Sequence, residues 1–446
     1  MTATASLPPG PRMPMPLQTL GWTVRTMPFL ERAQAKYGDM WTMKLAQEGP
    51  WVMVSDPDVV KQVFKGDPEV FRAGEGNAIL SPLVGHNSVL TLDGSAHMTQ
   101  RKLMLPPFHG RRMQAYGDLM REIAEREIDS WPSGTSMPLW PRMQAITLEI
   151  ILQAVFGLDE GPRLDALRSR LRDVLAASTA PVTMLLLAML GTRRFEGLKV
   201  VRRELDPADE LLFEQIRERR EDPDLDKRSD ILSMLLSARY EDGRPMSDAE
   251  LRDELVTLLV AGHETTATSL AWTMERLVRH PGALERLTDE VAAGEDEYMD
   301  AVVKETLRLR PVLPVVVRRL ARDAEVGGRL LPAGVAVAPC IHLVHRRPDV
   351  YPEPSRYRPE RFLEQPAGTY TWIPFGGGVR RCLGASFALF EMKQVLTAMI
   401  SRIEPSATTS TPERVTRRAI TMNPGDGGRV TVRRRTTAPE PVPAAA

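Results

Sequence analysis

The stretch FGGGVRRCLG, residues 375–384, places Cys382 between a glycine-rich loop and the start of an apolar helix. Glycine lets backbone N–H groups approach a sulfur atom closely, and the positive end of a helix dipole lowers the pKa of a thiol. A lone cysteine is more often a buried structural residue, so the function of Cys382 depends on the rest of the chain. The other cysteine, Cys340, follows a predicted strand without such a loop, and we interpret it as a core residue.

Upstream of this loop, the sequence predicts one long helix that opens at Ser247 and runs to His280, before a Pro-Gly pair. Ser247 can cap the helix while Glu250 reaches back to it, which is the capping-box pattern. At 1.5 Å per residue the helix would be roughly 50 Å long, enough to cross a domain. Its middle is apolar nearly all round, which indicates a buried helix.

The polar segment AGHETT, residues 261–266, interrupts this apolar middle. The Thr265 hydroxyl can compete for a carbonyl one turn back and so open the helix locally, and the Glu264 carboxylate can supply protons. The alternative is a capped kink in a buried helix, which the pattern of residues favours less. His263 is interpreted as a core or cavity histidine.

The loop pattern Phe-Gly-x-Gly-x-Arg-x-Cys-x-Gly resembles the haem-binding signature of the cytochrome P-450 superfamily at every specified position, and the resemblance extends from about Tyr37 to about Val432. It implies that Cys382 binds the iron of haem b. It also implies a mainly α fold with a small β region (α+β), one triangular domain with the haem between the long helix and the helix after the cysteine. We expect an N-terminal extension (1–20), a single catalytic domain (21–432) and a disordered tail (433–446).

The resemblance also implies the roles of residues elsewhere. Glu264 would relay protons and Thr265 would hydrogen-bond to the oxygen being activated. Arginine binds carboxylates in bidentate fashion, so matched basic residues would hold the haem propionates. The expected cofactor-binding set is His97, Arg101, Ala261, Arg318, Phe375, Arg380, Cys382 and Gly384, and the expected structural ion triad is Glu305, Arg308 and Arg361.

By the same analogy, the walls of the substrate cavity would be mainly apolar: Ala78, Ile79, Leu83, Val84, Val315, Val316, Ile420 and Met422. The predicted function is a haem-dependent monooxygenase that uses O2 to hydroxylate or epoxidise a lipophilic small molecule in secondary metabolism. The alternatives are oxidative cyclisation or coupling without oxygen insertion, and a haem protein that binds ligands without turnover. A zinc site at Cys382 lacks companion ligands at short spacing.

Composition and charge limit the classes of partner that we expect. The chain has 58 Lys and Arg residues and 58 Asp and Glu residues, so its formal net charge is zero. The electrostatic field of the whole protein therefore gives no reason to expect nucleic acid as a partner. The first twelve residues lack a signal-peptide pattern, and two cysteines are too few for a disulfide scaffold. We therefore expect a cytoplasmic monomer without a membrane anchor. Electrons would come from a separate ferredoxin or flavodoxin with its reductase.

Overall fold

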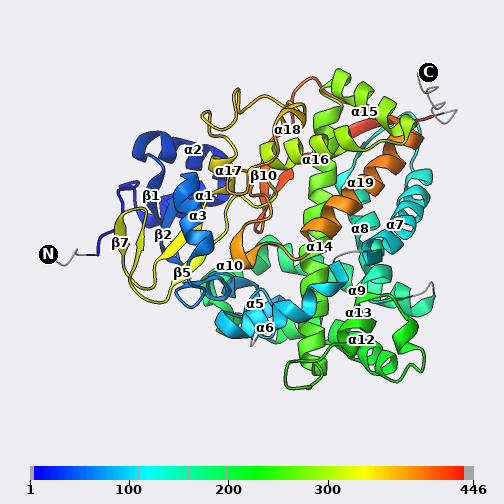
Figure 1. Ribbon diagram of the computed structural model, residues 1–446, viewed down its shortest axis with the longest axis horizontal. Helices are drawn as coiled ribbons and strands as arrows, with labels where there is room; N and C mark the ends of the chain where they lie inside the picture. Colours follow the sequence, from blue (N-terminus) through cyan, green and yellow to red (C-terminus); the bar gives the residue numbers. More distant parts are fainter. Residues whose placement is uncertain (1–4, 109–110, 159–160, 197, 436–446) are drawn as a thin grey trace.

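A computed structural model describes residues 5–108, 111–158, 161–196 and 198–435 of the chain. Helices make up most of it, with four small sheets, so the predicted mainly helical fold with a small β region is confirmed. Figure 1 shows most helices on one side and most strands on the other. The helices are α1 (Met15–Val24), α2 (Thr26–Tyr37), α3 (Pro57–Lys65), α4 (Ala73–Gly76), α5 (Ser81–Val84), α6 (Gly94–Met104), α7 (Arg111–Asp129), α8 (Trp140–Ala154), α9 (Pro162–Thr179), α10 (Pro181–Leu190), α11 (Thr192–Glu196), α12 (Lys199–Arg220), α13 (Ile231–Ser237), α14 (Asp248–Leu277), α15 (Pro281–Ala293), α16 (Glu297–Leu309), α17 (Ile341–Val344), α18 (Arg361–Glu364) and α19 (Ala385–Arg402).

The largest sheet has five strands in the order β1-β2-β8-β5-β3, and its strands come from both ends of the chain. Its β1 and β2 pair antiparallel, with Met40 opposite Val54 and Leu45 opposite Gly49. A second sheet has the order β4-β12-β9, and β10-β11 and β6-β7 form two-stranded hairpins. The strands are β1 (Met40–Leu45), β2 (Gly49–Val54), β3 (Phe71–Arg72), β4 (Thr135–Pro138), β5 (Arg318–Leu320), β6 (Ala324–Val326), β7 (Arg329–Leu331), β8 (Ala336–Pro339), β9 (Ile403–Ala407), β10 (Val415–Arg418), β11 (Thr421–Pro424) and β12 (Arg429–Arg434).

The long helix predicted at Ser247 is α14, which crosses the molecule in Figure 1. Ser247 and Glu250 form the reciprocal capping box, and the last helical residue is Leu277, three residues before the predicted end. Helices α8, α12, α16 and α19 pack against α14. Because neighbours surround it, α14 buries polar and apolar residues alike, as its all-round apolar middle predicts.

The ends of the chain differ from the predicted domain boundaries. The expected extension ends at residue 20, but α1 runs through that position, and the Pro8 and Pro9 carbonyls accept hydrogen bonds from Thr42. This segment therefore packs on the domain as an extra edge to β1. At the other end β12 continues to Arg434 because it pairs with β9, and the rest of the predicted tail, residues 436–446, lies outside the described residues.

Within the described part of the chain, none of the helices combines the length and the apolarity needed to cross a lipid bilayer.

Candidate active site

The cysteine loop is shaped by its contact with the end of α3. Gly378 has φ +64°, a left-handed conformation that glycine tolerates, and a Cβ there would lie 2.0 Å from the Phe64 carbonyl oxygen. A Cβ on Gly377 would lie 2.2 Å from the Phe64 ring. The Cys382 amide donates to the Phe375 carbonyl at 2.9 Å, which closes the loop just before α19 begins. Only glycine therefore fits where the loop passes Phe64.

Cys382 and Cys340 lie in opposite environments. Cys340 is completely buried and its thiol donates to the Pro314 carbonyl at 3.7 Å, as expected for a core residue. Cys382 is exposed. Surrounding protein nevertheless desolvates its thiol and raises the pKa, against the smaller opposing effects of the Gly384 amide and of Arg101 and Arg381. An accessible sulfur in a desolvating environment suits a ligand of a metal cation, which stabilises the thiolate.

Four basic residues of the predicted cofactor set share one region of the fold. Burial, and repulsion from Arg380, Arg101 and Arg318, lower the pKa of His97 to about 3. Burial and repulsion from Arg380 likewise lower the pKa of Arg318 to about 10. Asp93, which sequence reasoning missed, accepts from Arg380 at 2.6 Å. Its position before α6 is the one local signal that could have indicated it.

These residues fit a haem. His97 is 1% exposed, and among the described residues its Nδ1 atom has no hydrogen-bond partner. The hydrogen bond that Arg318 makes in the described chain goes to the Val317 carbonyl, and no carboxylate pairs with it there. Buried positive charge of this kind is costly without anionic partners. A macrocycle with two carboxylates and an iron would supply those partners and would bind the accessible thiolate.

The middle of α14 is accessible to solvent at one position. Ala261 is exposed, although the residues on either side along most of α14 are buried. The Thr265 hydroxyl donates to the Ala261 carbonyl at 2.6 Å, one turn back, while the backbone stays helical throughout. The local opening expected from the sequence is therefore absent, because the hydroxyl shares this carbonyl and does not break the helix.

Glu264 points toward α8 and the β10-β11 hairpin. Its Oε2 accepts from Gln144 Nε2 at 3.0 Å, and its Oε1 accepts from the Thr421 hydroxyl at 3.4 Å. Asn423 donates to Thr421 at 2.8 Å and accepts from Thr268 at 2.5 Å. Burial is the main effect on Glu264 and raises its pKa, while Arg418 and these hydrogen bonds lower it. Sequence reasoning missed Gln144, Thr421 and Asn423, since no local pattern connects them with Glu264.

His263 is buried, and desolvation lowers its pKa to about 4, with a smaller contribution from Arg172. In the part of the chain that the structure describes, its Nδ1 atom has no hydrogen-bond partner. The ring is therefore neutral, in keeping with its interpretation as a core or cavity histidine.

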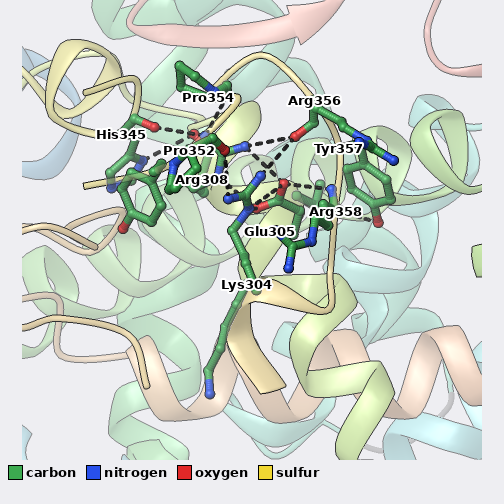
Figure 2. Close-up of polar contacts among 12 residues, drawn as sticks. Lys304, Glu305, Arg308, His345, Pro352, Pro354, Arg356, Tyr357 and Arg358 are labelled. Atoms are coloured by element: carbon green, nitrogen blue, oxygen red, sulfur yellow. Dashed lines mark hydrogen bonds and ion pairs between the residues drawn. The ribbon is translucent and has the colours of Figure 1, made fainter. Parts of the chain in front are cut away.

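Glu305 stands at the centre of a buried ion cluster, shown in Figure 2. Its two oxygens accept from Arg308 at 2.6 and 2.9 Å, and Arg361 donates from Nε at 3.1 Å. Arg308 also donates to the carbonyls of His345 and Pro354, both at 2.8 Å. All three charges are nearly inaccessible to solvent.

His345 connects this cluster with the cysteine loop. Its Nδ1 lies 3.2 Å from the Arg308 carbonyl, and its Nε2 accepts from the Ile373 amide at 2.8 Å. The Ile373 carbonyl in turn accepts from Gly376 in the loop at 3.0 Å. The cluster thus supports the chain segment that leads into the loop, through a histidine that the sequence did not single out.

The predicted cavity residues do not form one set. Ala78, Ile79 and Ile420 are exposed, and Leu83, Val315 and Val316 are partly buried. Val84 and Met422 are packed in the interior, at 0% and 2% exposed. Met422 lies against α14, where its carbonyl accepts from Trp272 at 2.8 Å. Val84 and Met422 are therefore much less accessible than the other six residues of the predicted cavity wall.

The profile of the cytochrome P-450 family matches residues 8–428. Cytochrome P-450 135B1 of Mycobacterium tuberculosis is 44% identical over 441 residues, covering 97% of this chain and 92% of the relative. Cytochrome P-450 138 of the same organism is 38% identical over 437 residues, covering 96% and 97%.

Two solved structures have the same fold. The retinoic-acid-bound cyanobacterial CYP120A1 superposes with a TM-score of 0.81 at 25% identity, covering 96% of this chain and 100% of that one. The heme domain of cytochrome P-450DA gives a TM-score of 0.82 at 24% identity, covering 99% and 100%.

Proposed function

Because this chain belongs to the cytochrome P-450 family of haem-thiolate monooxygenases, we propose that it hydroxylates or epoxidises a lipophilic small molecule in secondary metabolism. The family supplies the reaction class and the cofactor. The substrate class, the residue roles and the redox partners are the proposal. Support for it comes from the accessible segment of α14 and from the surroundings of Cys382.

Haem b, when bound, supplies the O2 chemistry that oxidises a C–H or C=C bond. Cys382 would provide the thiolate that binds the iron, held by a loop that Phe64 and α19 fix in place. His97, Arg101, Arg318 and Arg380 would bind the propionates, which offset their mutual repulsion. Phe375, Ala261 and Gly384 would line the ring.

Protons reach the reaction through Glu264 and Thr265. Burial raises the pKa of Glu264, so the protonated form of this carboxyl group persists to higher pH than in an ordinary glutamate. The group can therefore both donate and accept a proton. The Thr265 hydroxyl donates to the Ala261 carbonyl, so its oxygen lone pairs are free to accept a hydrogen bond from the cavity side. Glu264 and Thr265 are successive residues, and a proton passes between them once the Glu264 carboxyl group has left Gln144 or Thr421.

The observation that carries the proposal is the exposure of Ala261 in the middle of α14, most of whose other residues are buried. The Ala261 carbonyl accepts the hydrogen bond from Thr265, so the accessible part of the helix lies beside this hydroxyl. The exposed apolar side chains of Ala78, Ile79 and Ile420 support a lipophilic substrate. The CYP120A1 structure holds retinoic acid, which is itself lipophilic.

A separate ferredoxin or flavodoxin with its reductase would supply two electrons. Arg381, exposed beside Cys382, is the basic residue best placed to meet an acidic partner. Arg380 is mostly engaged with Asp93, so it contributes less to such a surface. The variant Arg381→Glu should slow reduction by the partner and leave the haem spectrum unchanged; unchanged reduction kinetics would remove Arg381 from this role.

The decisive experiment is turnover under labelled O2 after a panel of apolar compounds has been screened for spin-state shifts. The proposal requires one labelled oxygen atom in the product. A dehydrogenated, cyclised or coupled product without the label would favour oxidative ring closure or coupling. Ligand binding without substrate-dependent consumption of reductant would favour a non-catalytic haem protein.

A further inference from the structure

Helix α1 exposes more apolar side chains than an ordinary surface helix does. Leu17, Leu20 and Val24 point outward and are 53%, 57% and 68% exposed, whereas Gln18 on the opposite face is 2% exposed. We call these three residues the α1 apolar face. Their spacing of three and four residues places them on one side of the helix. A surface helix normally turns its apolar side chains to the core, so this face awaits a partner.

Exposed apolar side chains are concentrated around this face. Among the described residues ten large hydrophobic side chains are exposed, and six of them lie between Leu7 and Val24. Besides the α1 apolar face, the six include Leu7, Met13 and Met15, at 37%, 43% and 43% exposed. Single exposed apolar residues are normal, but their concentration in one short segment indicates a binding surface.

The inner face of α1 is fixed, so the helix cannot simply turn over to bury its leucines. Gln18 donates to the carbonyls of Pro11 and Met13 and accepts from the Lys44 amide at 2.9 Å. Trp22 is buried, and the Arg417 guanidinium lies 4.6 Å from its ring centre. These contacts hold the α1 apolar face toward solvent.

The charges near α1 are positive, which favours a negatively charged partner. Residues 1–30 contain Arg12 and Arg25 and no Asp or Glu, and both arginines are exposed. The first carboxylate of the chain, Glu31, is 2.9 Å from His342 and is also paired with Arg346. Neither arginine forms an ion pair with another described residue, and an apolar face flanked by such arginines is complementary to a lipid surface that is apolar inside and negatively charged outside.

The polar side chains of α1 suit insertion at a lipid interface. Thr19 and Thr23 donate their hydroxyl hydrogens to the carbonyls four residues before them, at 3.0 and 2.7 Å. A hydroxyl that is satisfied within its own helix costs little to move out of water.

We propose that α1, through its apolar face and the flanking Arg12 and Arg25, binds the surface of an anionic lipid bilayer without crossing it. The helix lies in the plane of the interface and is anchored to the protein by Gln18 and Trp22. The membrane is favoured over a second copy of the chain because two such basic faces would repel each other. This inference does not depend on the substrate class proposed above.

The test is sedimentation of the full-length haem-loaded protein with vesicles of phosphatidylcholine alone or mixed with phosphatidylglycerol. We expect binding to the mixed vesicles that weakens as salt is added. The variant Leu17→Gln/Leu20→Gln/Val24→Gln should bind at least about tenfold more weakly. Its matched control, Leu17→Met/Leu20→Met/Val24→Met, keeps the face apolar and should bind like the parent. The variant Arg12→Gln/Arg25→Gln should lose roughly fivefold per arginine on the mixed vesicles only.

Because these side chains are exposed, the variants should keep the parent's thermal stability and haem spectrum, which shows that any loss of binding is local. Absence of parent binding to the mixed vesicles would overturn the proposal. Binding of the variant Leu17→Gln/Leu20→Gln/Val24→Gln that equals the binding of the parent would overturn it too. A dimer that forms without vesicles, and that dissociates in the variant Leu17→Gln/Leu20→Gln/Val24→Gln, would assign the face to a second copy of the chain instead.

Discussion

The side-chain amide of Gln144, on α8, lies 3.0 Å from the carboxyl group of Glu264, on α14. This hydrogen bond holds the carboxyl group of Glu264, the proposed proton relay, beside a neighbouring helix and away from the accessible segment of α14 at Ala261. The Thr421 hydroxyl holds the other carboxyl oxygen at 3.4 Å. Glu264 must leave at least one of these partners to pass a proton toward Thr265, so Gln144 acts as a positioning residue.

Replacing Gln144 with Leu should change the pH dependence of turnover. The Gln144 amide favours the ionised form of Glu264 and lowers its pKa, so its loss should raise that pKa further. The acidic limb of the rate profile should therefore move to higher pH. Gln153→Leu, on the same helix but bonded to Glu149, serves as the control and should leave the profile unchanged.

Thr265→Ala should remove the hydroxyl that completes the proton path. We expect product formation to fall at least about tenfold while reductant is still consumed, because proton delivery then fails. Thr265→Ser keeps the hydroxyl and should recover most of the product yield. The ratio of product to reductant consumed measures both; a ratio unchanged in the alanine variant would contradict the role of Thr265.

Cys382→Ala should abolish the red-shifted Soret band of the reduced CO complex, because the proposed thiolate ligand is gone. Cys340→Ala is the matched control, since this second cysteine is buried and bonded to a backbone carbonyl. It should keep the band and lose only about 1 kcal/mol of stability from the small cavity it leaves. An intact band in the Cys382 variant would defeat the assignment.

Removing Arg361 should destabilise the protein strongly. Arg361→Leu leaves Glu305 with one arginine in a buried site, and breaking such a cluster costs about 3–5 kcal/mol. Denaturant unfolding measures this cost. The exposed pair of Arg356 and Glu353 provides the comparison, and Arg356→Ala should cost less than about 1 kcal/mol. Similar costs for the two variants would show that the buried cluster has no special structural role.

His345 should make the folded state sensitive to acid. Burial, and to a smaller extent repulsion from Arg308, hold the pKa of His345 well below the ordinary value of 6.5. As the pH falls, this histidine is therefore protonated in the unfolded chain before it is protonated in the folded protein. Its contribution to stability is therefore complete above about pH 6.5 and is lost below it. His345→Gln should be less stable at neutral pH, and its gap to the parent should narrow by about 1.4 kcal/mol per pH unit below 6.5. A constant gap between pH 7 and 5 would contradict this.

The sequence by itself determined the features that depend on neighbouring residues. The capping box of Ser247 and Glu250 involves residues three apart, and the glycine loop before Cys382 has a fixed spacing, so both are visible in a linear pattern. The same holds for Glu305 and Arg308 on one turn of α16. Local geometry fixes these relationships before any tertiary contact forms.

Only the tertiary structure decided which distant segments meet. It brought Gln144 to Glu264 and placed His345 between the ion cluster and the cysteine loop. It also buried Met422, which the analogy to the family had placed in the cavity wall, and it turned the leucines of α1 toward solvent. Burial and long-range hydrogen bonds depend on how helices and sheets pack together, and a helix with two possible faces does not reveal from its sequence alone which one the rest of the fold will cover.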